Sequence, residues 1–286
     1  MIRFTASIEG LTLKVTVSGF AIYLDNWAIN DLAEGDPDRR KRFLETIDAG
    51  AELIFSVSNA AELAGPQGRS ADAAKAFLNE IGPRWYPVEL DTSEVIKREL
   101  NGQKPATSCI SARFLQDYTR IQMAQGDTKK IVDPQDLLRL GGVLEWVGPQ
   151  RDSIRNGSAD FDAMLAKKIG ERRSKFKRNP SREDRGFPIL SFRPDMPASF
   201  AFHNLLRTLI VEGQPVKKGD GLDFCHAVMA SGFANFAALD KHWKRRIEGL
   251  PQPNGLARIY GPWELDQLVT DIESWVNSNQ RLAASR

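Results

Sequence analysis

The sequence predicts an α/β protein with a central parallel sheet, a β-hairpin at residues 1–19 and a helical insertion at 91–215. Two largely apolar runs, at 20–24 and 52–57, are typical of strands that are buried on both faces. Strands and helices alternate over 20–90 and again over 216–286, and these two segments form the expected core. Residues 91–215 carry mainly helical periodicity, so we interpret them as an insertion into that core and not as a separate fold.

The first half of the chain has clear signals for individual elements. In chain order we expect a hairpin that turns at Glu9-Gly10, a strand at 20–24, a helix at 36–50, a strand at 52–57, a short helix that carries Glu62, a helix at 70–81 and a strand at 84–88. Asp36 and Pro37 mark the start of the helix at 36–50, as N-cap and first helical residue. Ser58 or Asn59 is expected to cap the short helix.

The second half begins with the insertion and then returns to alternation. We expect helices at 107–125, 133–147, about 151–176 and 198–211, followed by a helix at 221–231, a strand at 235–239, a helix at 241–248, a strand at 256–260 and a helix at 262–276.

The composition excludes several classes of protein. The 286 residues are 42% hydrophobic and 27% charged, which excludes a disordered, collagen-like or coiled-coil chain. The net charge of +2 identifies no partner. Two cysteines, Cys109 and Cys225, are too few for a disulfide framework or a cysteine-based zinc site. The sequence contains neither a signal-peptide pattern nor an apolar membrane span, so we expect a cytoplasmic protein without membrane contact.

Four acidic residues follow strands or begin the helices next to them. Asp25 ends the first buried strand, Glu62 follows the second, Asp223 opens the helix at 221–231, and Asp240 ends the strand after it. In open parallel sheets, functional groups gather at the carboxyl edge, where the strand order reverses. Carboxylates that converge there repel one another unless a cation joins them, and such hard oxygen ligands suit Mg²⁺ or Mn²⁺. A divalent ion held in this way can polarise a phosphodiester and activate water.

The sequence resembles the PIN-domain family of metal-dependent nucleases. The resemblance depends on residues 22–26, on 55–63 and above all on 219–230, continued by 237–243. It implies a three-layer sandwich around a parallel sheet, with Asp25, Glu62, Asp223 and Asp240 as the catalytic and metal-binding acids. It covers roughly 20–90 and 216–262 and leaves the hairpin and most of the insertion unexplained.

Several residues near the acids have two interpretations. Asp220 and Asp223 compete for the roles of N-cap and metal ligand; we expect Asp220 to be the cap and Asp223 the ligand. His226 lies one turn after Asp223 and either contacts substrate or is packed and hydrogen-bonded, the second being favoured. Asn26 and Asn59 either hydrogen-bond to the acids or serve as turn and cap residues. Lys241, the basic residue after Asp240, is a candidate for substrate contact.

The segment 167–185 is strongly basic and is a candidate nucleic-acid-binding surface. Its basic residues are Lys167, Lys168, Arg172, Arg173, Lys175, Lys177, Arg178, Arg182 and Arg185. Such a cluster is the electrostatic footprint of phosphate-backbone contacts. The alternative is a solvated helix face that runs into a loop.

Together these observations predict a Mg²⁺- or Mn²⁺-dependent endoribonuclease. Single-stranded RNA is preferred over DNA as substrate on the family resemblance alone, and a toxin or host-defence role, an inhibitor protein or a homodimer would fit that activity. Two alternatives stay open: a non-catalytic PIN-like module that binds nucleic acid or assembles with partners, and a DNA-directed nuclease. A metal-dependent phosphohydrolase of small phosphate esters is a further rival.

Overall fold

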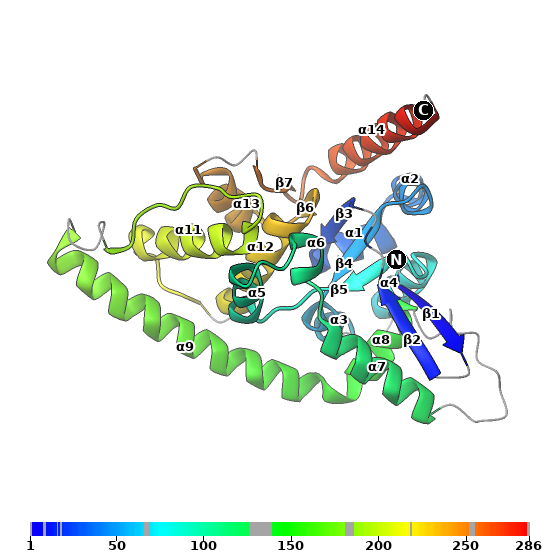
Figure 1. Cartoon of the computed structure of the whole chain (residues 1–286), viewed down its shortest axis with the longest axis horizontal. Coiled ribbons are helices and arrows are strands. Elements are labelled where there is room, and N and C mark those ends of the chain that lie inside the picture. Colours follow the sequence, from blue (N-terminus) through cyan, green and yellow to red (C-terminus); the bar gives the residue numbers. More distant parts are fainter. Residues whose placement is uncertain are drawn as a thin grey trace.

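A parallel sheet lies at the centre of the protein (Figure 1). The computed structural model describes residues 2–7, 10–15, 17, 19–65, 69–125, 139–180, 186–217, 219–251 and 255–284. Within these residues the sheet has five strands: Ala21–Leu24 (β3), Glu52–Phe55 (β4), Trp85–Pro87 (β5), Phe236–Ala238 (β6) and Arg258–Tyr260 (β7). They lie in the order β5-β4-β3-β6-β7, and every neighbouring pair is parallel. The predicted α/β class with a parallel sheet is therefore confirmed.

The strand order reverses between β3 and β6. Along the chain, β4 and β5 are added on one side of β3, whereas β6 and β7 are added on its other side. Helices that connect these strands are α1 (Asn26–Glu34), α2 (Pro37–Asp48), α3 (Val57–Leu63), α4 (Arg69–Glu80), α12 (Asp220–Phe233) and α13 (Lys241–Glu248), and α14 (Leu265–Ala284) follows β7 and contacts α2. Because parallel crossovers are right-handed, the two directions place α1–α4 on one face of the sheet and α12 and α13 on the other. Helices therefore flank the sheet, an arrangement compatible with a three-layer sandwich.

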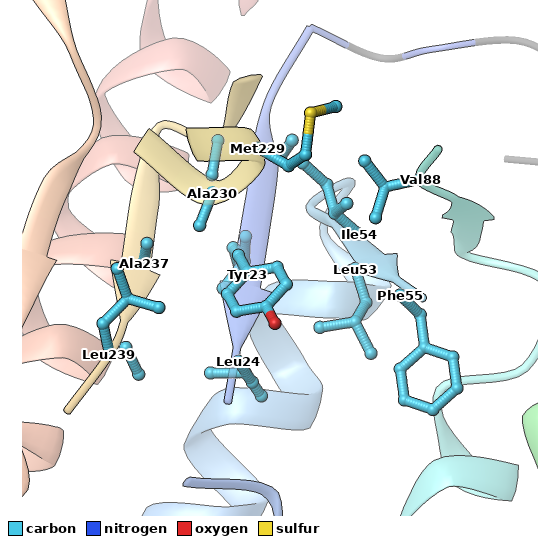
Figure 2. Close-up of a cluster of buried hydrophobic side chains, with 14 of the residues drawn as sticks. Tyr23, Leu24, Leu53, Ile54, Phe55, Val88, Met229, Ala230, Ala237 and Leu239 are labelled. Atoms are coloured by element: carbon cyan, nitrogen blue, oxygen red, sulfur yellow. The ribbon is translucent and has the colours of Figure 1, made fainter. Parts of the chain in front are cut away.

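The core of the protein is formed where α12 packs on the sheet. Figure 2 shows Tyr23 and Leu53 of neighbouring strands together with Met229 and Ala230 of α12. Every residue of β3 and β4 is buried, as expected for strands covered on both faces. Each large apolar side chain buried in this way stabilises the fold by about 1.5–3 kcal/mol.

The N-terminal hairpin is confirmed, with a shifted turn. Strands Ile2–Ser7 (β1) and Gly10–Val15 (β2) pair antiparallel, from Ile2 opposite Val15 to Ser7 opposite Gly10. Gly10 was expected in the turn but already belongs to β2. Ile8 and Glu9 lie outside the described residues.

The described part of the segment between β5 and α12 is mainly helical, as predicted. Helices described there are α5 (Thr92–Leu100), α6 (Pro105–Ser108), α7 (Ala112–Gln125), α8 (Leu140–Val147), α9 (Arg151–Arg178) and α11 (Pro197–Glu212), with a 3-10 turn at Gly148–Gln150. Residues 133–138 of the helix expected at 133–147 lie outside the described residues, as do Arg182 and Arg185 of the basic segment. The long helix α9 runs along one side of the molecule and contacts α3, α11 and α12 (Figure 1). Among the described helices, none has the length and apolar character needed to cross a membrane.

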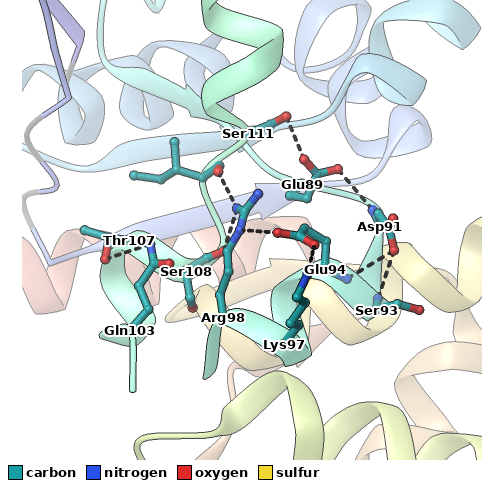
Figure 3. A network of polar contacts seen from close by, with 11 residues as sticks. Glu89, Asp91, Ser93, Glu94, Lys97, Arg98, Gln103, Thr107, Ser108 and Ser111 are labelled. Atoms are coloured by element: carbon teal, nitrogen blue, oxygen red, sulfur yellow. Dashed lines mark hydrogen bonds and ion pairs between the residues drawn. The ribbon is translucent and has the colours of Figure 1, made fainter. Parts of the chain in front are cut away.

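Polar contacts fasten the start of this helical segment to the end of β5. Figure 3 shows Arg98 of α5 donating to the carbonyl oxygens of Ser108 (3.1 Å) and Ile110 (2.9 Å). Ser111 donates to Glu89, and Asp91 caps α5. The buried Glu99 accepts hydrogen bonds from the backbone of α11 at Ala198 and Ser199, both at 2.9 Å.

Two local predictions about the first half need correction. Helix α1 was not expected, because Asp25-Asn26 was interpreted as a simple strand end. The cap of α3 is neither Ser58 nor Asn59 but Ser56, whose hydroxyl accepts from the Asn59 backbone (3.0 Å). Asn59 completes a reciprocal capping box with Ser56, because its side chain accepts from the Ser56 backbone in return.

Candidate active site

Asp25 and Asp240 lie where the strand order reverses. Asp25 directly follows β3, and its backbone N–H donates to the Ala238 carbonyl of β6 (3.1 Å). Asp25 is the N-cap of α1 and accepts from the backbone of Asn26 (2.8 Å). Asp240 is the N-cap of α13 and accepts from the backbone of His242 (2.8 Å) and Trp243 (3.1 Å). Each carboxylate is therefore held at the positive end of the helix that it begins.

Asp223 reaches the same region from the first turn of α12. That helix begins at Gly219, whose φ of +96° is a left-handed conformation that favours glycine. The side chain that satisfies this helix start comes from Asp162 of α9, which accepts from the backbone of Gly219 (2.6 Å) and Gly221 (2.9 Å). The contact is so close that a Cβ at position 221 would lie 2.6 Å from an Asp162 oxygen. An acid of the insertion thus determines where α12 begins.

The cap role predicted for Asp220 is wrong. Asp220 is the first residue of α12, and its carboxylate accepts from the Lys217 backbone (2.6 Å), which closes the turn before the helix. Asp162, and not Asp220, accepts from the backbone N–H groups of Gly219 and Gly221. Sequence reasoning missed Asp162, since nothing in a polar helix marks one acid as the partner of a segment nearly sixty residues away.

Glu62 joins the site through Asn26. Glu62 is exposed on α3, and the Asn26 side-chain amide donates to its carboxylate. Asn26 in turn accepts from the Asn59 side chain (3.2 Å). Asn26 therefore hydrogen-bonds to one of the predicted acids, as one of its two interpretations required.

A buried polar network connects α3 to α12 beneath the acids. The Asn59 amide also donates to the Tyr23 hydroxyl (3.3 Å), and its oxygen accepts from Ser56 (2.7 Å). Ser56 Oγ lies 3.2 Å from Nε2 of His226. Because the hydroxyl has one proton and its shorter contact is with Asn59, His226 is the donor from Nε2. Burial lowers the pKa of His226 to about 4, so this imidazole is neutral near pH 7 and is packed and hydrogen-bonded, as favoured.

The four acids are electrostatically coupled. The pKa of Asp25 is raised to about 6, chiefly by burial; the hydrogen bond from Asn26 opposes this rise, and the nearby charges of Glu62 and Asp240 add to it. Burial also raises the pKa of Asp223 to about 7, with Asp25, Asp240 and Glu62 contributing. Positively charged side chains nearby would have lowered the pKa values of Asp25 and Asp223. The structure therefore brings all four predicted acids close enough for their negative charges to raise the pKa values of Asp25 and Asp223.

These residues fit a hard divalent cation in the chemistry of their donors. In the described ranges, neither Asp25 nor Asp223 forms an ion pair with a basic side chain, so a cation would relieve the charge that raises their pKa values. In the same ranges, no three His, Cys, Asp or Glu side chains lie close enough together to hold a metal ion as they stand. The four acids are therefore near enough to shift one another's pKa values but too far apart to share one metal ion as they stand.

The predicted basic contacts are distributed over two places. Lys241 is exposed in the first turn of α13, directly after Asp240. On α9, Arg172, Lys175, Lys177 and Arg178 are exposed. Arg173 is not, because its guanidinium donates to the Leu209 carbonyl of α11 (2.6 Å) and burial lowers its pKa. Arg173 therefore has a structural contact within the protein.

A pocket of about 450 Å³ opens beside the acids. Its lining includes the acidic residues Asp220, Asp223 and Asp240 together with Lys217, His242 and Arg245. Sequence reasoning missed the three basic and imidazole residues. The run of basic residues that follows Asp240 was a visible signal for two of them.

Comparison of the chain with protein-family models, with curated proteins and with solved structures finds no match.

Proposed function

We propose that the protein is a metal-dependent nuclease with a PIN-like fold that hydrolyses phosphodiesters in single-stranded RNA. The observation that carries this proposal is the gathering of Asp25, Asp240, Asp223 and Glu62 around the point where the strand order reverses. This is the position at which open α/β sheets bind their ligands. The resemblance to PIN-domain nucleases in sequence, and a sheet flanked by helices, support the same assignment.

The residues of the site would divide the work. Asp25, Asp223 and Asp240 would hold Mg²⁺ or Mn²⁺, with Glu62 completing the set of oxygen donors. Such an ion supplies Lewis-acid polarisation of the phosphate and lowers the pKa of a bound water. Asn26 orients the Glu62 carboxylate, and the network of Asn59, Ser56 and His226 keeps α3 and α12 in register beneath the acids.

The preference for RNA follows from the resemblance, and the test must include the rivals. Purified full-length protein is incubated with mixed RNA and single-stranded DNA in Mg²⁺, in Mn²⁺ or in EDTA. We expect RNA cleavage with either ion and none in EDTA. Cleavage of DNA alone would identify a DNA-directed nuclease, and hydrolysis of nucleotide monoesters alone would identify a small-ester phosphohydrolase. Binding of nucleic acid without any hydrolysis would identify a non-catalytic module and overturn the proposed activity.

A further inference from the structure

The pocket beside Asp223 and Asp240 is lined by charged side chains of both signs. Its lining includes Asp220, Asp223 and Asp240 together with Lys217, His242 and Arg245. Glu212 and Arg246 also line the pocket but form an ion pair with each other, with 3.1 Å between Oε2 and Nε. The Arg246 guanidinium in addition lies 4.9 Å from the centre of the Trp243 ring. Glu212 and Arg246 therefore neutralise each other within the lining.

Lys217 and Arg245 are cations without protein partners in the part of the chain that the structure describes. Both side chains are exposed, and neither forms an ion pair there, although three aspartates line the same pocket. In the described residues, these acidic and basic side chains of the lining therefore do not neutralise each other through ion pairs. The sugar-phosphate backbone of a nucleic acid would complement this lining, because one phosphate would meet the acids through a divalent cation while the next would meet lysine or arginine.

We infer that this pocket binds the backbone of single-stranded RNA, and that Lys217 and Arg245 contact a phosphate next to the one that is cleaved. The inference rests on the proposed function, since it places the reacting phosphate at the acids. The pocket volume, about 450 Å³, is within the usual range for ligand pockets. The contacts nearest to the chemistry then come from α13 and the segment before α12, and those of α9 lie further out.

The test is the salt dependence of RNA binding. Affinity of a fluorescein-labelled single-stranded RNA is measured by anisotropy with all four acids intact and with Ca²⁺ in place of Mg²⁺, because Ca²⁺ also takes carboxylate oxygens but is a weaker Lewis acid, so the RNA stays uncut. The pocket variant is Lys217→Gln/Arg245→Gln. The charge-conserving variant is Lys217→Arg/Arg245→Lys. The matched control is Lys104→Gln/Arg113→Gln, which removes two exposed charges at other places on the surface.

We expect the pocket variant to bind more weakly and to lower the slope of log affinity against log salt by about 1.4, which corresponds to two lost contacts with single-strand phosphates. The charge-conserving variant and the control should have the same salt slope as the protein with unchanged Lys217 and Arg245. Because all these side chains are exposed, thermal melting should be the same for every variant. An unchanged slope in the pocket variant, or an equal loss in the control, overturns the inference.

The same samples separate this inference from the proposed activity. Metal-dependent cleavage by the wild type together with an unchanged slope in the pocket variant rejects the pocket and keeps the nuclease. A lowered slope without cleavage by the wild type rejects hydrolysis and keeps the pocket as an RNA-binding site. If the pocket variant lowers the salt slope for single-stranded DNA while the protein does not bind RNA, RNA is not the ligand of this pocket and the inference is overturned.

Discussion

Asp25 and Asp240 are positioned by their neighbours in sequence and in the sheet, whereas Asp223 is positioned by a helix of the insertion. The strand-end acids cap α1 and α13 themselves, and the Asp25 backbone is bonded to β6. The helix that carries Asp223 begins where Asp162 of α9 accepts from its backbone. The same long helix reaches the end of α3, where Arg151 donates to the Gly65 carbonyl (3.3 Å). Asp25, Asp240 and Glu62 are therefore positioned by the core itself, whereas the position of Asp223 depends on the insertion.

The largest expected effect is at the strand ends. Asp25→Asn and Asp240→Asn should each lower RNA cleavage by roughly a thousandfold or more, because loss of a metal-binding oxygen removes several kcal/mol of transition-state stabilisation. Asparagine keeps an oxygen for the cap, so both variants should stay folded. Asp36→Asn is the matched control, since Asp36 caps α2 in the same way. Equal activity in Asp25→Asn, Asp240→Asn and this control would contradict the assignment.

The second effect concerns the insertion. Asp162→Ala leaves the buried N–H of Gly221 and the part-buried N–H of Gly219 without their acceptor and should destabilise the protein by about 2–4 kcal/mol. At a temperature where it is folded, cleavage should fall about 10–100-fold and half-maximal activity should require more Mg²⁺, because Asp223 is no longer held in place. Asp160→Ala, an exposed acid on the same helix, is the control. Lost stability with an unchanged Mg²⁺ requirement would reduce Asp162 to a structural role.

A third effect is on stability as a function of pH without metal. The folded-state pKa values of Asp25 (about 6) and Asp223 (about 7) lie above the ordinary value of 3.8. The folded protein therefore binds more protons than the unfolded chain between about pH 4 and 7, so the free energy of unfolding falls as pH rises through that window. We expect a loss on the order of 3 kcal/mol between about pH 5 and 7.5 in EDTA, measured by urea unfolding.

A neutral variant isolates this contribution. His226, whose pKa is lowered to about 4, acts with the opposite sign: between about pH 6.5 and 4 the unfolded chain binds a proton at this imidazole while the folded protein keeps it neutral, so the free energy of unfolding falls as pH falls. Both the wild type and Asp223→Asn contain His226, so its contribution cancels in the difference between their pH profiles of unfolding free energy. The variant should have a flatter pH profile and greater stability near neutral pH in EDTA. Parallel profiles for the two proteins would show that Asp223 carries no raised pKa.

The smallest effect is expected at the far end of α9. Replacing Arg172, Lys175, Lys177 and Arg178 with glutamine should weaken RNA binding and lower the salt slope by up to about 0.7 for each lost phosphate contact. Turnover at saturating RNA should change little, since these residues do not line the pocket beside the acids. Arg173 is left intact because it donates to the α11 backbone. A salt slope equal to that of the wild type would make this surface a solvated helix face.

The sequence was informative wherever position depends on local pattern. Continuous apolar runs identified β3 and β4, and an N-cap aspartate followed by proline identified the start of α2. Helix α1 was also visible in principle, since its buried residues Ala28, Ile29, Leu32 and Ala33 recur at helical spacing. The strand order and the Asp162 contact were not, because both depend on which distant segments meet after folding. The same limit hid Lys217, whose role depends on the pocket.

The most direct test of the metal site is a crystal structure of the full-length protein grown with Mn²⁺ and measured at the manganese absorption edge. We expect an anomalous peak bounded by the carboxylates of Asp25, Asp223 and Asp240, and no such peak in crystals of Asp25→Asn grown under the same conditions. A well-ordered structure of the wild type with these aspartates free of Mn²⁺, or with the ion bound only elsewhere, would contradict this expectation.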